Sequence, residues 1–161
     1  MKRLLIVYHS RTGGSEAMAR AAVQGATHEL EVILKCAADA GPEDLLTADG
    51  YLFACPENLA SMSGVMKDFF DRCYYPVLGQ IEGRPYATMI CAGSDGEGTA
   101  RQMTRIALGW RLKVVADPLI ICTHAQTPGA ILAAKVIEAA ALAKCRELGA
   151  LFGAGLAMGA F

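Results

Sequence analysis

The chain has 161 residues, of which 53% are hydrophobic and 19% are charged, and its formal net charge is −1. Its length is enough to bury a core and suits a single domain over residues 1–161. The nearly neutral net charge excludes the basic surface of a nucleic-acid-binding protein. No apolar run reaches the roughly 20 residues that a membrane helix needs. The six cysteines form no CxxC pair. We therefore expect a cytoplasmic protein with reduced thiols and neither disulfides nor a metal site.

Strands and helices are expected to alternate along the chain. Residues 3–8 form an almost continuous apolar run, which is typical of a strand covered on both faces, and residues 14–26 place small and apolar side chains on one helical stripe. Further strands are expected at 30–35, 50–55, 86–92 and 113–122, the last interrupted by Asp117-Pro118. Further helices are expected at 42–46, at 63–73 with Pro76 closing the unit, at 99–110, and from Pro128 or Gly129 to about Gly149. This alternation predicts a parallel sheet with right-handed crossovers.

Hydroxyls and glycines gather in the loop between the first strand and the first helix. They are Ser10, Thr12, Gly13, Gly14 and Ser15. Glycines let the backbone approach an anion, and the unpaired amides at a helix N-terminus point toward it. The loop therefore predicts a phosphate site, in which Arg11 partly neutralises the charge. The alternative is an ordinary Ser/Thr-rich turn with a helix cap.

The spacing Ser10-x-Thr12-Gly13-x-Ser15 after LLIVY resembles the phosphate loop of the flavodoxin-like family, which binds the phosphate of FMN. The loop is neither a Walker motif nor the dinucleotide-binding GxGxxG. The resemblance implies a flavodoxin-like, doubly wound α/β sandwich with a five-stranded parallel sheet in the order 2-1-3-4-5. Ligands of such sheets bind beyond the carboxyl ends of the strands.

A second loop, residues 56–64 followed by VMKDFFDR, resembles the corresponding segment of NAD(P)H-dependent FMN and quinone reductases. In that family a Pro-led loop lies along the edge of the isoalloxazine ring. The resemblance implies flavin contacts from Pro56, Glu57, Asn58, Leu59, Ala60, Ser61 and Met62. The alternative interpretation of Asn58 is a left-handed turn residue, with which contact to the ring is compatible. We expect Asp71 and Arg72 to lie on a solvated helix face.

A third glycine-rich loop follows the strand at residues 86–92 and completes the expected site. By resemblance, its residues lie at the other side of the flavin ring, where free amides donate to the pyrimidine carbonyls. They are Ala92, Gly93, Ser94, Asp95, Gly96 and Gly98. A surface turn is the alternative interpretation of this loop alone.

The resemblance implies an FMN-dependent NAD(P)H oxidoreductase that reduces quinones, flavins or similar small acceptors, with the flavin rather than a side chain carrying the chemistry. Neither the second nor the third loop contains Trp or Tyr, so one face of the ring is open to a planar acceptor. Residues 57–59 contain no glycine, and a non-glycine residue needs about 1–2 kcal/mol to adopt the left-handed backbone. Because flavodoxins use such a backbone flip to stabilise the one-electron-reduced flavin, we expect two-electron transfer here.

Two other functions stay open. One is a flavodoxin-type electron-transfer protein that serves a partner reductase, and the other is a sheet domain that binds a different phosphate ligand without redox chemistry. The resemblance also leaves open a homodimer and the choice between NADH and NADPH.

Several conspicuous residues receive no catalytic role. His9 has either a structural role at the strand end or a role as a donor to the anion, and the reach of His124 to the ring is left open. His28 is interpreted as a surface residue, and Trp110 as part of the core or of a dimer contact. The glycine-rich apolar tail from Gly149 onward has no assigned role.

Overall fold

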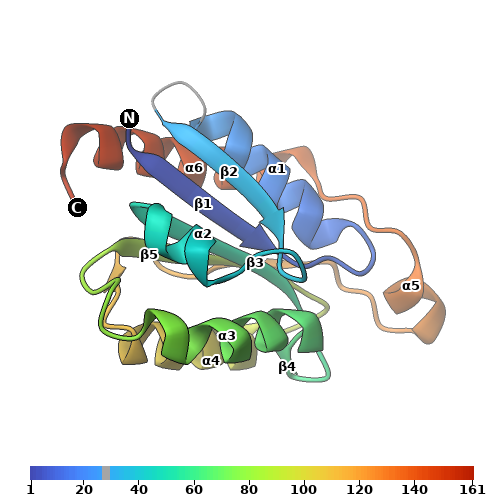
Figure 1. The fold of residues 1–161 in the computed structure, drawn as a ribbon. Coiled ribbons are helices and arrows are strands. Elements are labelled where there is room, and N and C mark those ends of the chain that lie inside the picture. The colour runs from blue at the N-terminus through green and yellow to red at the C-terminus, as the bar shows by residue number, and fades with distance from the viewer. Residues whose placement is uncertain (27–29) are drawn as a thin grey trace.

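The computed structural model describes residues 1–26 and 30–161, so His28 lies outside the described residues. A central sheet carries helices on both faces (Figure 1). The strands are β1 (Arg3–Tyr8), β2 (Glu31–Cys36), β3 (Gly50–Asn58), β4 (Ser61–Met62), β5 (Pro85–Ala92), β6 (Lys113–Val114) and β7 (Leu119–Cys122). The helices are α1 (Gly14–Ala26), α2 (Pro42–Thr47), α3 (Gly64–Val77), α4 (Glu97–Gly109), α5 (Pro128–Leu132) and α6 (Ala139–Met158).

The sheet has the predicted order, β2-β1-β3-β5, with β6 and β7 both paired to β5. All of these pairs are parallel. The predicted fifth strand is split into β6 and β7 around Asp117-Pro118, because proline has no N–H to donate to a ladder. The short strand β4 was not predicted; it pairs antiparallel with the end of β3.

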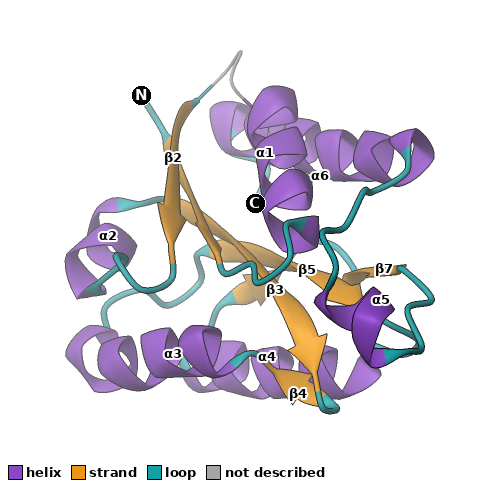
Figure 2. Cartoon of the chain, turned by 90° about the vertical axis from the view of Figure 1, so that its right-hand side faces the viewer, coloured by secondary structure: helices purple, strands orange, loops and turns teal. Residues whose placement is uncertain are grey.

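The core lies in two layers, one on each face of the sheet. Leu5 and Val7 of β1 belong to the layer under α2, α3 and α4, while Leu4 and Ile6 belong to the layer under α1 and α6. Figures 1 and 2 show this division of the helices. All four side chains are fully buried, which explains why β1 is apolar at consecutive positions instead of alternate ones.

The prediction of one last helix from residue 128 or 129 to about 149 is wrong. The chain forms the short helix α5, then an irregular segment, and then α6, which continues through the tail to Met158. The backbone N–H of Lys135, between the two helices, donates to Thr12 O at 2.8 Å. This hydrogen bond holds the segment between α5 and α6 against the loop after β1. A continuous helix would place Lys135 elsewhere.

The glycines of α6 explain the tail to which the sequence assigned no role. A Cβ at Gly149 would lie 1.9 Å from Ala22 O of α1, and a Cβ at Gly25 of α1 would lie 1.9 Å from Arg146 O. Only glycine permits such a distance, so α1 and α6 pack backbone against backbone. The tail is therefore part of the scaffold that covers one face of the sheet.

The opposite layer contains one further difference in detail, at Pro76. The third helix does not end before Pro76. Pro76 lies in the last turn of α3, where it has no N–H and one helical hydrogen bond is therefore missing. Trp110 is buried, as expected for a core residue, and its Nε1 donates to Tyr74 O at 3.0 Å.

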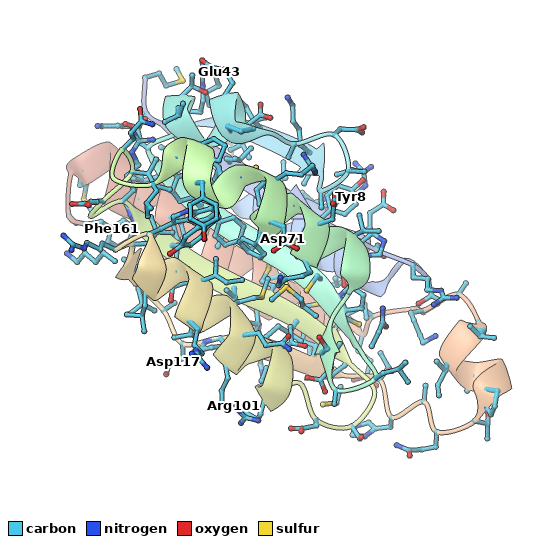
Figure 3. The ribbon with its side chains drawn as sticks, turned by 60° about the horizontal axis from the view of Figure 1, so that its bottom comes forward. Tyr8, Glu43, Asp71, Arg101, Asp117 and Phe161 are labelled. Carbon is cyan, nitrogen blue, oxygen red and sulfur yellow. The ribbon has the colours of Figure 1, made fainter. Side chains whose placement is uncertain are left out.

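Asp71 and Arg72 of α3 are both exposed, as expected. Asp71 pairs with Lys67 at 2.6 Å on an exposed face of α3 (Figure 3), as expected. Arg72 pairs with Asp68 at 2.8 Å on the exposed surface, and it also donates to Ala37 O and Ala40 O, which ties α3 to the loop after β2. No helix in the described ranges is long and apolar enough to span a membrane, and the same residues contain no cluster of three or more His, Cys, Asp or Glu suited to a metal.

Candidate cofactor-binding site

A pocket of about 460 Å³ opens at the edge of the sheet where β1, β3, β5 and β7 end. Figure 2 shows α5 and the β3–β4 hairpin at this same edge. The pocket is lined by Arg11, Thr12, Pro56, Glu57, Asn58, Leu59, Ala60, Cys91, Ala92, Gly93, Ser94, Thr123, Ala125, Gln126, Ile131 and Lys135. The carboxyl edge of a parallel sheet is the expected position for a ligand.

The loop after β1 presents unpaired backbone donors to this edge. Gly13 has a φ of 97° and donates its N–H to Ser10 Oγ at 3.0 Å, which closes the turn. The first helical bond of α1 runs from Ala17 N to Gly13 O. Within the described residues, the N–H groups of Gly14, Ser15 and Glu16 have no acceptor. Together with the positive end of the helix dipole, they form a suitable environment for an anion.

Ser15 adds an unsatisfied hydroxyl to these amides. The residue is 2% exposed, and its Oγ has no hydrogen-bond partner in the described structure. A buried polar group without a partner costs about 1–3 kcal/mol, so native structures seldom retain one without a reason. A phosphate group would satisfy both this hydroxyl and the neighbouring amides. The residues present therefore fit the phosphate of an FMN molecule.

His9 has a structural position beside this loop. Its Nδ1 lies 2.8 Å from Ser63 Oγ, at the residue that precedes α3. Burial lowers the pKa of His9 below its ordinary value of 6.5, and the charge of Arg11 lowers it further. The imidazole is therefore neutral at pH 7 and joins the end of β1 to the start of α3. Arg11 is exposed at the pocket mouth.

The second loop is a tight hairpin. Leu59 and Ala60 have φ values of 52° and 64°, while Asn58 pairs with Ser61 in the β3–β4 ladder. The alternative interpretation of Asn58 as the left-handed turn residue is therefore wrong, as is the assumption that a tip without glycine avoids this conformation. Two central residues at positive φ characterise the type I′ turn, whose twist matches that of the flanking strands.

Only part of the second and third loops reaches the pocket. Glu57 turns its carboxylate to α4, where it accepts from Gly96 N at 2.8 Å and Thr99 N at 3.1 Å. These amides are thus occupied by a side chain and are not free for the flavin. Of the predicted site residues, the pocket wall does not include Ser10, Gly13, Gly14, Ser15, Ser61, Met62, Asp95, Gly96 and Gly98.

The sequence interpretation did not include a fourth wall, built from the segment after β7. Thr123 and His124 attach it to the third loop through Ala92 O and Gly93 O. The position of Thr123 after the last strand was a usable signal. The position of Lys135 gave no such signal, because this residue was expected inside a helix. Its Nζ donates to the carbonyls of Ala130, Ile131 and Ala133 at 2.6–2.8 Å. His124 is exposed and lies outside the pocket wall.

Comparison with known proteins identifies the family. The sequence profile of the NADPH-dependent FMN reductases matches residues 37–127. The chain belongs to this family. It is also 35% identical over 100 residues to a flavodoxin of Aquifex aeolicus (strain VF5), covering 61% of this chain and 54% of the relative. An NAD(P)H dehydrogenase (quinone) of Acidithiobacillus ferrooxidans is 32% identical over 94 residues, covering 45% and 47%.

This member of the FMN reductase family spans about half the length of the curated relatives it matches. A flavodoxin from the domain Archaea has the same fold, with a TM-score of 0.77 at 17% identity, covering 96% of this chain and 98% of the other. The fold is therefore flavodoxin-like, as predicted. The family match includes the second and third loops but not residues 9–15, so the phosphate site stands on its geometry alone.

The cysteines of this family member offer no nucleophile at the pocket. Burial raises the pKa of the Cys91 thiol in the pocket wall, although the charge of Lys135 acts in the opposite direction. Burial also raises the pKa of Cys55, at the end of β3, to about 12. Both thiols are therefore protonated at neutral pH and unreactive as nucleophiles.

A second pocket, of about 360 Å³, lies at the opposite edge of the sheet and is lined in part by Lys2, Asp49 and Arg84. The charged side chains Lys2, Asp49 and Arg84 of this second pocket already have partners within the protein. Arg84 Nη1 donates to the carbonyls of Leu45 and Ala48 at the end of α2, and Asp49 pairs with Lys2 at 3.2 Å. The unsatisfied donors are at the carboxyl edge, which is therefore the candidate site.

Proposed function

We propose that this chain is an FMN-dependent oxidoreductase that accepts two electrons from NADH or NADPH and delivers them to a quinone, a flavin or a similar small acceptor. The observation that carries the proposal is the buried, unpartnered Ser15 Oγ beside three unpaired amides at the start of α1. Membership of the NADPH-dependent FMN reductase family supports both the cofactor and the donor.

Specific residues would hold each part of FMN. The amides of Gly14, Ser15 and Glu16 and the Ser15 hydroxyl would bind the phosphate, and Arg11 would supply positive charge at the mouth of the pocket. The ring would occupy the pocket, whose wall is formed by the β3–β4 hairpin, residues 92–94, and Thr123, Ala125 and Gln126. When bound, FMN supplies the hydride-accepting and hydride-donating chemistry. The chain contributes binding, orientation and exclusion of water.

The rim of the pocket suits a planar apolar acceptor. Leu59 is 101% exposed and Ile131 is 50% exposed, yet both line the pocket. No Trp or Tyr is among the described residues of the pocket wall, so no aromatic side chain covers a ring bound there. An open ring face between two apolar side chains leaves space for a quinone or a second flavin to stack.

Electron transfer to a partner protein is a second candidate, and two observations favour it. One is the relative named flavodoxin, which is 35% identical. The other is the positive φ of Leu59 and Ala60, which removes the sequence argument that this tip avoids the left-handed backbone. The hairpin is nevertheless bonded to α4 on both strands, and this opposes a backbone rearrangement between redox states.

Anaerobic mixing separates these functions. The purified chain is first loaded with FMN, and binding is followed by the change in flavin fluorescence. We expect NADH or NADPH to bleach the flavin absorbance and an added quinone to restore it. Failure to bind FMN would refute the proposal as a whole. Bleaching by dithionite but by neither nucleotide would favour the electron-transfer protein.

A further inference from the structure

The tip of the β3–β4 hairpin has a backbone conformation that its residues disfavour. Leu59 and Ala60 are both in the left-handed region, where a Cβ meets the neighbouring carbonyl. Type I′ turns strongly prefer Asn and Gly at these positions. The side chain of Leu59 is fully exposed, so its own burial does not compensate for the unfavourable backbone.

The hairpin itself is too short to impose this conformation. Its ladder consists of two residue pairs, Glu57 with Met62 and Asn58 with Ser61. An isolated two-stranded hairpin is only marginally stable, even with favourable turn residues. The interactions that hold Leu59 and Ala60 at positive φ must therefore come from outside the hairpin.

Helix α4 contacts both strands of the hairpin. Gln102 Oε1 accepts from Met62 N at 2.8 Å, and its Nε2 donates to Ser61 Oγ at 3.1 Å. On the other strand, the Glu57 carboxylate accepts from Gly96 N and Thr99 N at the first turn of α4. The two strands are thus bonded to positions along the same helix.

The tip also approaches α4 closely. A Cβ at Gly98 would lie 2.6 Å from Ala60 O, so Gly98 is needed to admit the turn. This explains why Gly98, predicted to contact the flavin, lies outside the pocket wall. Gly98 instead contacts the hairpin that forms this wall, through Ala60 O, and so supports it.

We propose that α4 is a clamp that holds the hairpin in its left-handed turn, with Gln102 and Glu57 as positioning residues and Gly98 as the contact surface. Asn58, Leu59 and Ala60 line the pocket, so the clamp sets the shape of this wall before a ligand enters. The consequence for flavin affinity rests on the proposed function. The clamp itself is a property of the flavin-free chain.

The test combines a backbone measurement with an affinity measurement. In the flavin-free chain, NMR coupling constants that report φ at Leu59 and Ala60 are compared for the wild type and for Gln102→Ala. We expect both residues to leave the left-handed region in the variant. FMN should then bind about tenfold more weakly, the effect of losing a hydrogen bond that sets the wall. Arg101→Ala, exposed on the same helix (Figure 3), is the matched control and should change neither quantity.

Two rescues distinguish a clamp from general damage to the fold. Gln102→Glu retains an acceptor for Met62 N and should keep the turn. Adding Ala60→Gly to Gln102→Ala removes the steric cost of the left-handed backbone and should restore most of the affinity. Gly98→Ala approaches the clamp from the other side, because its Cβ displaces Ala60 O, and should move the same coupling constants.

The outcomes are separable. Unchanged φ values in both Gln102→Ala and Gly98→Ala would overturn the clamp, whether or not FMN binds. Changed φ values with unchanged FMN affinity would overturn the positioning role. A wild-type chain that binds no FMN refutes the proposed function, while the NMR comparison still decides the clamp.

Discussion

The contact between α1 and α6 and the β3–β4 hairpin use glycine in opposite ways. Between the helices, Gly25 and Gly149 are required because a Cβ at either would lie 1.9 Å from a carbonyl oxygen of the other helix. In the hairpin, Leu59 and Ala60 occupy a left-handed backbone that favours glycine. The scaffold thus uses glycine to relieve contact. The site keeps side chains at unfavourable positions and holds them by bonds from α4.

The largest effect is expected from breaking the helix contact. Gly149→Ala places a methyl group against the backbone of Ala22, and α6 must move away from α1. We expect the free energy of unfolding to fall by about 3 kcal/mol, at the upper end of the range for an overpacked core. Urea denaturation followed by circular dichroism measures the change.

Gly153→Ala is the matched control on the same helix. Its Cβ would lie 3.4 Å from Ala26 O, an ordinary contact, and alanine favours a helix over glycine. Stability should therefore rise, by up to about 1 kcal/mol. Equal losses in the two variants would show that helix α6 does not approach α1 at Gly149 in the way described.

Ser15→Ala tests the site without disturbing the scaffold. Removing the hydroxyl should weaken FMN binding about ten- to a hundredfold, because a hydrogen bond to a charged phosphate contributes about 1.5–3 kcal/mol. The stability of the flavin-free chain should stay the same or rise slightly, since an unsatisfied buried hydroxyl is lost and a better helix former is gained. Fluorescence titration and urea denaturation measure the two quantities. A parallel loss of both would assign Ser15 to the scaffold instead.

The sequence predicts the fold well where burial alone decides. The apolar run of β1 reports two covered faces, and the alternation of strands and helices reports a parallel sheet. The division of residues 128–158 into α5 and α6 was not predicted, because it depends on a bond from Lys135 N to Thr12 O that no local pattern contains. The role of the tail was also missed, since glycines in an apolar run do not reveal which helix they approach.

The site shows the same limit. The loop around Ser15 is recognisable because its donors are adjacent in sequence. The role of Gln102 is not recognisable, because Gln102 lies 40 positions from Met62, from whose N–H it accepts a hydrogen bond. Leu59 and Ala60 were not expected at positive φ, since local propensity disfavours it and only the tertiary contacts of α4 reverse that preference.

The pH dependence of stability should include a component from the carboxyl edge. The pKa of His9 is lowered in the folded chain, so at acid pH the unfolded state binds a proton more readily than the folded state. Its contribution to stability is present above the ordinary pKa of 6.5 and is lost as the pH falls through the lower, folded value. Urea denaturation of the wild type and of His9→Gln from pH 8 to pH 5 measures this component. The variant should lose less stability on acidification, and an identical slope would contradict the assignment.

The smallest effect is the sharpest for the comparison, because its sign reverses between the two regions. Ala60→Gly removes a left-handed alanine that costs about 1–2 kcal/mol, while the greater freedom of glycine in the unfolded chain takes back about 0.5–1 kcal/mol. We expect a net gain of about 0.5 kcal/mol in the free energy of unfolding. Ala150→Gly, exposed in the interior of α6, should instead lose about 1 kcal/mol, the ordinary cost of glycine in a helix. A loss in both variants would mean that the hairpin carries no backbone strain, and α4 would then have nothing to hold.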